Sequence, residues 1–214
     1  MNQVVVFDVG ANLGQNSLHL ARQHPNVIVH AFEPVPELIN HLKMSSIAFK
    51  SRYHIHPIAL NNVNGMTKFN VAANDDRAQW GCSSLNNFKE GLDKTWPDFD
   101  IKFDFTHQID VEMMTFKAWY ENSGLKLTDI HYFHCDTQGS DLKVLSGMEE
   151  YIDLIHEGMI ECASDEIGKL YEDSHTVEDA IVFMRDHGFA VVSITPNDPF
   201  GNEFNMHFKN KRFI

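Results

Sequence analysis

The chain has 214 residues, 43% of them hydrophobic, which supports one sizeable core with an insertion rather than two full domains. Its formal charge of -13 disfavours a nucleic-acid backbone or an anionic membrane as partner. No apolar run approaches the roughly 20 residues that span a bilayer, and the N-terminus lacks a signal-peptide pattern. We therefore expect a single cytoplasmic domain over residues 1–214 with a small-molecule partner.

Strand and helix patterns alternate along most of the chain. The expected strands are 4–9, 27–32, 53–60, 130–135 and 158–162, and the expected helices are 12–23, 36–49, 140–155 and 176–187. Such alternation is typical of parallel strands joined by right-handed crossovers. The sequence therefore predicts an α/β fold built on a doubly wound, mostly parallel sheet.

Two parts of the chain depart from this alternation. Strands at 189–194 and 205–209 are joined by a connection too short for a helix, which predicts a C-terminal antiparallel hairpin. Between residues 62 and 122, strands at 66–72 and 108–115 flank a polar loop that carries aromatic residues. We predict that this β-rich insertion covers the active face.

The first strand ends in a glycine-bearing turn from Asp8 to Gly14. In an open α/β sheet, ligands bind beyond the carboxyl ends of the strands. Gly10 and Gly14 permit a tight turn and a close approach of backbone to a ligand at a helix N-terminus. Asp8 is placed to accept a hydrogen bond from an ammonium or a hydroxyl group.

The second strand ends in Phe32-Glu33-Pro34, about 20 residues after the glycine turn. An acidic residue at this distance grips the ribose diol in nucleoside-binding α/β folds, so we interpret Glu33 as a ribose ligand. A glycine turn alone also suits a structural turn, and a strand-end glutamate alone is often merely solvated. Their order in one chain favours a nucleoside site.

Three blocks of sequence, from Phe7 to Gly14, from Ala31 to Pro34 and from Phe133 to Gly147, resemble the FkbM-type methyltransferases. That family shares the class I S-adenosylmethionine-binding fold, and the resemblance covers most of the chain. It implies that the cofactor is S-adenosylmethionine. Two residues depart from the family's Asp-x-Glu-Gly-x-Glu pattern, because Gln138 and Asp141 stand where it usually has glutamate.

The resemblance also implies a set of site residues, in which the first turn takes the amino-acid half of the cofactor, the second strand end its ribose and the third its adenine. The cofactor residues are Asp8, Gly10, Ala11, Asn12, Gly14, Glu33, Pro34, Ala59, Leu60 and Asn61. Residues 82–85 resemble a serine-bearing segment that the family places over the active face, which makes Ser83 and Ser84 substrate candidates. Glu161 resembles the acidic residue that the family's fifth strand often carries.

Methyl transfer from a sulfonium needs few catalytic groups, because the electrophile is already activated and the protein mainly aligns the nucleophile and removes its proton. Asp136, at the carboxyl end of the fourth strand, is the predicted base, and the alternative is that it caps the following helix. His134 is a second candidate because alternate strand residues share a face. Asp136 and Glu161 also suit magnesium or calcium, although no metal is predicted.

Two tryptophans are assigned different places: Trp80 is a substrate candidate and Trp119 is a core candidate. Trp80 lies beside Gly81 and the serine pair, where its ring would stack on a sugar or another flat acceptor. Trp119 lies in an apolar helical pattern with Phe116, which favours a place in the core.

The sequence as a whole predicts an S-adenosylmethionine-dependent methyltransferase that methylates a hydroxyl of a sugar or natural-product-like small molecule. An NAD-dependent oxidoreductase is the main alternative, but its fingerprint places glycines at the first, third and sixth positions, which here are Gly10, Asn12 and Gln15. A non-catalytic cofactor-binding module of the same fold stays open because of the departures at Gln138 and Asp141.

Overall fold

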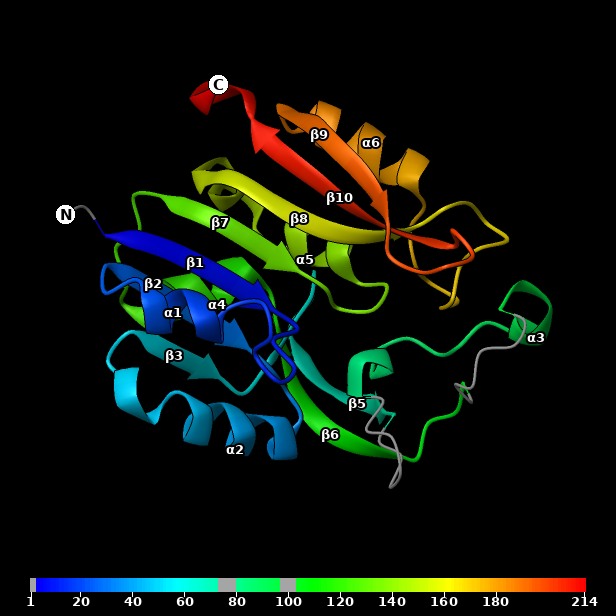
Figure 1. Ribbon diagram of the computed structural model, residues 1–214, viewed down its shortest axis with the longest axis horizontal. Coiled ribbons are helices and arrows are strands. Elements are labelled where there is room, and N and C mark those ends of the chain that lie inside the picture. Colours follow the sequence, from blue (N-terminus) through cyan, green and yellow to red (C-terminus); the bar gives the residue numbers. More distant parts are fainter. Residues whose placement is uncertain (1–2, 73–79, 97–102) are drawn as a thin grey trace.

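The structure is a computed structural model that describes residues 3–72, 80–96 and 103–214. Its main sheet consists of β1 (Val4–Val9), β2 (Val27–Phe32), β3 (Tyr53–His56), β7 (Ile130–Cys135), β8 (Ile155–Ala163), β9 (Phe189–Pro196) and β10 (Glu203–Asn210). These strands lie in the order β3-β2-β1-β7-β8-β10-β9 (Figure 1). The order reverses direction between β1 and β7, which is where open α/β sheets bind their ligands.

The pairing confirms the predicted fold class. Strands β3, β2, β1, β7 and β8 pair in parallel, whereas β10 pairs antiparallel with both β8 and β9. The protein is thus a doubly wound α/β fold with a mostly parallel sheet and a C-terminal antiparallel hairpin.

Helices cover both faces of the main sheet. In chain order the described helices are α1 (Leu18–Gln23), α2 (Pro36–Ser45), α3 (Leu92–Thr95), α4 (Phe116–Ser123), α5 (Asp141–Ser146) and α6 (Val177–Asp186), with 3-10 helices η1 (Ile47–Phe49), η2 (Trp80–Cys82), η3 (Glu149–Leu154) and η4 (Lys211–Phe213); α3 lies away from the main sheet (Figure 1). Helices α1 and α2 contribute to the apolar cluster on one face, and α4, α5 and α6 to the cluster on the other. None of the helices in the described part of the chain has the length and apolarity of a membrane span.

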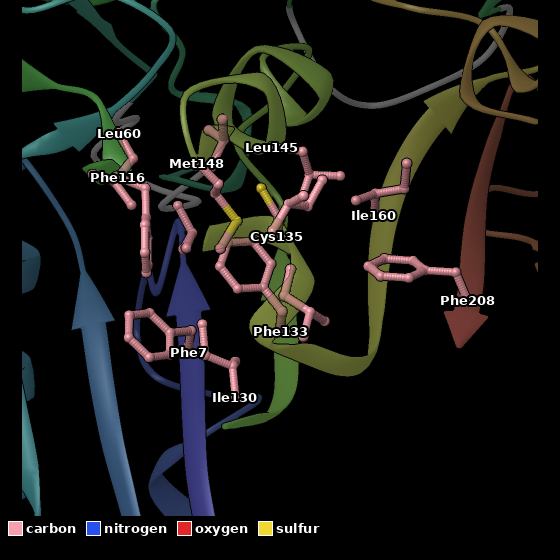
Figure 2. Close-up of a cluster of buried hydrophobic side chains, with 14 of the residues drawn as sticks. Phe7, Leu60, Phe116, Ile130, Phe133, Cys135, Leu145, Met148, Ile160 and Phe208 are labelled. Atoms are coloured by element: carbon pink, nitrogen blue, oxygen red, sulfur yellow. The ribbon is translucent and has the colours of Figure 1, made fainter. Parts of the chain in front are cut away.

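The side-chain alternation of β1 feeds both clusters. Phe7 and Val9 point into the larger cluster, where they meet Phe133, Phe116 and their neighbours, whereas Val6 points into the smaller one against α1. Figure 2 shows Phe7 and Phe133 side by side on adjacent strands of this larger cluster. Because both faces of the central strands are buried, their sequences read as continuous apolar runs.

The insertion contributes two strands, β5 (Gly65–Val71) and β6 (His107–Met114), to a second sheet in the order β4-β6-β5, whose third strand β4 (Ala59–Leu60) precedes it. Strands β5 and β6 pair antiparallel, close to the predicted 66–72 and 108–115. The expected strand 53–60 divides at Pro57, which lacks a backbone N–H, and its second part joins this smaller sheet.

Two helices are shorter than predicted for reasons of backbone conformation. The expected helix 12–23 begins only at Leu18, because Asn12 and Gly14 adopt left-handed backbone conformations with φ of 50° and 77°. The expected helix 140–155 divides into α5 and η3, because Glu149 is also left-handed with φ of 48°. Trp119 lies in the core as predicted, with 7% of its surface exposed.

A group of stacked histidines extends the aromatic core towards the sheet edge. His30 on β2 stacks on Phe7 and on the rings of His54 and His56, and its Nδ1 lies 3.1 Å from Nε2 of His56. Burial, together with the smaller effect of neighbouring histidines, lowers the pKa of His30 to about 3 and that of His56 to about 4. These rings are therefore neutral members of the core.

The neutral histidines make stability depend on pH. In the unfolded chain both residues titrate near 6.5, so below that pH the unfolded state binds protons that the folded state does not. The stability that the neutral rings confer is present at pH 8 and is lost as the pH falls through 6.5 towards 4.

We predict that the double substitution His30→Phe/His56→Phe reduces the loss of unfolding free energy at acid pH. The His30 substitution alone should remove about 2 kcal/mol of this loss between pH 6.5 and 5. Urea unfolding at pH 8 and pH 5 measures the difference. The exposed His41 on α2 provides the control, and His41→Phe should keep the wild-type dependence. A double variant that loses as much stability in acid as the wild type would contradict the assignment.

Candidate functional site

A cavity of about 260 Å³ lies at the carboxyl ends of β1, β2 and β7, beside the point where the strand order reverses. Apolar side chains of two separate clusters wall it, including Leu38 and Phe69 from one and Trp96 and Leu170 from the other. The predicted site residues in its wall are Gly10, Asn12, Glu33, Pro34, Ala59, Leu60, Ser83, Asp136 and Glu161.

The turn after β1 and the loop after β7 touch at the floor of this cavity. Gly10 has φ of 79°, and a Cβ at this position would overlap the backbone carbonyl of Asp136. The amide of Asp136 donates to the carbonyl of Val9 at 3.0 Å. Only glycine permits this approach, and the approach fixes where Asp136 enters the cavity.

Glu33 connects the second strand end to the first turn. Its carboxylate accepts the backbone amide of Asn12 at 2.8 Å and that of Val35 at 2.9 Å, and only 4% of the residue is exposed. Burial, with a smaller contribution from the charge of Asp8, raises its pKa to about 7 against the effect of the two amides. Each carboxylate oxygen has a second lone pair that these two amides do not use.

Asn12 carries an acceptor that has no partner. Its side-chain Oδ1 is buried and makes no hydrogen bond among the described residues, although the residue lies in the cavity wall. A buried polar atom without a partner is costly, so a hydrogen-bond donor that reached this oxygen would lower the free energy. An ammonium group, such as that of an amino acid, has the donors that this oxygen lacks.

Asp8 lies beneath the cavity rather than in its wall, which differs from the predicted direct contact with the cofactor. Its carboxylate accepts hydrogen bonds from the Ser17 hydroxyl and from Nδ1 of His134, the latter at 2.9 Å, and the residue is fully buried. The Ser17 hydroxyl in turn lies 2.8 Å from that of Tyr53. Asp8 thus holds β1, β7 and the start of α1 together.

His134 was predicted to stand beside Asp136, but the structure places it elsewhere. It is the cross-strand partner of Asp8, only 4% exposed and not in the cavity wall. Burial opposes its protonation, yet the hydrogen bond and the charge of Asp8 outweigh burial and raise the pKa of His134. The ring therefore pairs with Asp8 below the cavity. The predicted shared face with Asp136 does not form, because Asp136 lies past the end of β7, where the alternation of strand side chains no longer applies.

Four other predicted residues also lie behind the wall. The Ala11 amide donates to Phe32, and Gly14 is left-handed where a Cβ would overlap Leu18 and Leu42, so both serve packing. The Asn61 side chain accepts its neighbour's amide. Ser84 is fully buried, and its hydroxyl donates to the Gln138 carbonyl at 2.7 Å, which fastens the insertion to the loop after β7.

Ser83 and Trp80 are the remaining substrate predictions. Ser83 lies in the cavity wall, but its hydroxyl accepts the amide of Ala72 at 3.0 Å. The side chain of Trp80 lies outside the described residues. Among the residues that the structure describes, no group of three or more His, Cys, Asp or Glu side chains is arranged to hold a metal ion.

Asp136 and Glu161 meet across the cavity through Gln138. The Gln138 side-chain amide donates to Asp136 at 2.6 Å and to Glu161 at 2.9 Å, and the Asn197 amide also donates to Glu161. Burial raises the pKa of Asp136, and burial together with neighbouring carboxylates raises that of Glu161 well above its usual value. The predicted helix cap is absent here, since the N-cap of α5 is Ser140 and the Asp136 carboxylate receives the Gln138 side chain.

Sequence reasoning missed the acidic far side of the cavity. Asn197, Asp198 and Glu203 arrive there from the connection and second strand of the C-terminal hairpin, and burial raises the pKa of Glu203 to about 8. The polar composition of that connection was the available signal. None of the described residues in the cavity wall is basic.

Comparison with known proteins bears directly on this site. The family model described as the methyltransferase FkbM domain matches residues 8–191, a span that includes the glycine turn, Glu33, Asp136 and Glu161. The chain belongs to the FkbM methyltransferase family.

Two curated relatives of this FkbM-family chain are methyltransferases by name. The "31-O-demethyl-FK506 methyltransferase FkbM" of Streptomyces tacrolimicus is 26% identical over 88% of the chain and 74% of its own length. The "2-O-methyltransferase NoeI" of Sinorhizobium fredii is 26% identical over 68% of the chain and 58% of its own length.

Solved structures share the fold at low sequence identity. An FkbM methyltransferase from Methylobacillus flagellatus matches with a TM-score of 0.56 at 12% identity, over 97% of this chain. This chain spans only 43% of the Methylobacillus protein. The magnesium protoporphyrin IX methyltransferase of Synechocystis, solved with bound S-adenosylmethionine, matches with a TM-score of 0.52 at 10% identity, over 98% of this chain and 71% of its own.

We predict that Gly10→Ala destabilises the protein by about 2–4 kcal/mol, because the methyl group meets a backbone carbonyl and the backbone is left-handed. Gly188→Ala is the matched control, since Gly188 has nearly the same φ but open space around it, and it should cost about 1 kcal/mol. Urea unfolding of both variants measures the two costs. Equal costs would show that the contact between Gly10 and Asp136 does not constrain the fold.

Proposed function

We propose that this FkbM-family protein is an S-adenosylmethionine-dependent O-methyltransferase whose acceptor is a hydroxyl of a sugar or natural-product-like small molecule. The observation that carries the proposal is the convergence of Gly10, Asn12 and Glu33 with Asp136 in one cavity at the strand reversal. The named activities of the two curated relatives support oxygen as the methyl acceptor.

The described residues fit the cofactor that the family implies. The Asn12 Oδ1 would accept from the ammonium, and the Glu33 carboxylate would accept from the ribose hydroxyls. The adenine ring would lie between apolar side chains such as Leu38, Leu60 and Phe69. When bound, the cofactor supplies an activated methyl group on a sulfonium centre.

The protein's own task is then to position the acceptor and to take its proton. Asp136 is the group we assign to this task, because it lies in the cavity wall between Gly10 and Glu161. Burial raises its pKa, which makes its carboxylate a stronger base than that of an ordinary aspartate. Glu161 and Glu203 provide further acceptors for the hydroxyl groups of a polyhydroxylated molecule.

The alternatives from the sequence have less support. An NAD-dependent oxidoreductase does not agree with the family model, which matches a methyltransferase domain over residues 8–191. A non-catalytic module would not need an ionisable group such as Asp136 in the same cavity as the proposed cofactor ligands.

We predict that Glu33→Ala weakens S-adenosylmethionine binding at least about tenfold, because the ribose loses its acceptors and the first turn loses its anchor. Asp136→Asn should leave binding within about threefold of wild type and slow methyl transfer by about 100-fold or more. Calorimetric titration measures the first effect. Formation of S-adenosylhomocysteine with a panel of sugars and hydroxylated natural products measures the second.

The exposed Glu37 on α2 supplies a control of the same charge, and Glu37→Ala should change neither quantity. Glu33→Gln separates loss of contact from misfolding, because it keeps one acceptor oxygen for a backbone amide. Normal binding in both Glu33 variants, or normal turnover in Asp136→Asn, would overturn the assignment of that residue.

A further inference from the structure

Gln138 has a backbone conformation that its side chain does not favour. Its φ is 55°, in the left-handed region that non-glycine residues rarely adopt. The conformation is held from outside, because its carbonyl accepts the Ser84 hydroxyl at 2.7 Å and the Asn86 side-chain amide at 3.3 Å. Strain that the surroundings enforce in this way is concentrated at functional positions, where it aims a side chain.

Both polar atoms of the Gln138 side chain make hydrogen bonds. The nitrogen donates to Oδ1 of Asp136 at 2.6 Å and to Oε2 of Glu161 at 2.9 Å. The oxygen accepts the hydroxyl of Tyr171 at 2.8 Å, and the nitrogen faces the carboxylates because ionised carboxylates only accept hydrogen bonds. Tyr171 is 1% exposed and also contacts the Cys82 carbonyl at 2.9 Å, so the amide is held by a rigid neighbour.

Two carboxylates within reach of one nitrogen repel each other unless something stands between them. A proton or a cation is the usual solution, but here a neutral amide supplies one N–H to each carboxylate. No basic residue shares the described cavity wall, so the amide is the donor that both carboxylates have in common.

We propose that Gln138 is a positioning residue that bridges Asp136 and Glu161 through its amide and keeps Asp136 available to take the acceptor's proton. This inference rests on the proposed function for the role of Asp136, but the bridge itself does not. A glutamate at position 138 would put a third carboxylate in the bridge, and repulsion between like charges would favour protonation of the cluster.

Other titratable groups on the surrounding elements influence the carboxylates of the bridge or their neighbours, and all of them are retained in the position-138 variants. They are Asp8 on β1, His134 on β7, Asp141 on α5, Asp198 and Glu203 from the C-terminal hairpin, and the Cys82 and Tyr171 side chains. Because these groups are unchanged, a comparison of substitutions at position 138 isolates the effect of the amide.

The test follows the titration of the Asp136 and Glu161 carboxyl carbons by NMR in the full-length protein, assigned with Asp136→Asn and Glu161→Gln. Gln138→Glu should raise the titration midpoint of the pair by at least about one pH unit, because like charges share one site. Gln138→Gly should also raise it, because hydrogen bonds to the charged forms are lost, and it should fold well since glycine suits the left-handed backbone. Gln15→Glu adds a carboxylate elsewhere in the cavity wall and should shift the pair less.

The pH profile of methyl transfer then links the bridge to catalysis. Its acid limb should move upwards in Gln138→Glu by the same amount as the NMR midpoint, whereas S-adenosylmethionine affinity at alkaline pH should stay within about threefold. Unchanged midpoints in both Gln138 variants would overturn the bridge. Shifted midpoints without methyl transfer by the wild-type protein would support the bridge and overturn the proposed function instead.

Discussion

The contact between the turn after β1 and the carbonyl of Asp136 is the constraint on which the site depends. A side chain larger than hydrogen at Gly10 would overlap that carbonyl, so the two loops meet only because residue 10 is glycine. From this contact Asn12 turns into the cavity and offers its amide to Glu33, while Asp136 enters from the other side. One backbone approach thus brings the proposed cofactor ligands and the proposed base into one cavity.

The ionisable residues below the cavity are arranged differently from those in its wall. Below it, Asp8 and His134 form a buried, hydrogen-bonded pair, which ties β1 to β7 without using the ligand space. Within the cavity, burial raises the pKa of Glu33 to about 7 and that of Glu203 to about 8, and no basic residue of the described wall compensates. This surplus of hydrogen-bond acceptors suits a ligand that carries positive charge or many hydroxyl donors. The side-chain amide of Gln138 donates to two of these acceptors, Asp136 and Glu161.

The sequence predicted most strongly where the chemistry is local. The strands 4–9 and 27–32 were predicted with their observed bounds, because apolar runs buried on both faces end at a glycine and before a proline. The helix after the first turn was predicted too long, since left-handed conformations at Asn12 and Gly14 do not show in the periodicity. His134 was predicted at the cavity because strand alternation indicates which side chains share a face but not which other residues they contact. Glu203 was missed because only the long-range pairing of the C-terminal hairpin brings it to the cavity.

The most direct test of this account is a crystal structure of the protein with S-adenosylhomocysteine. The account predicts the product in the cavity at the strand reversal, with its ribose hydroxyls on the Glu33 carboxylate, its ammonium on the Asn12 side chain and its sulfur on the side of Asp136. A product bound outside this cavity, or bound with its ribose away from Glu33, would contradict the central claim that the glycine turn and the Asp136 loop together build the cofactor site.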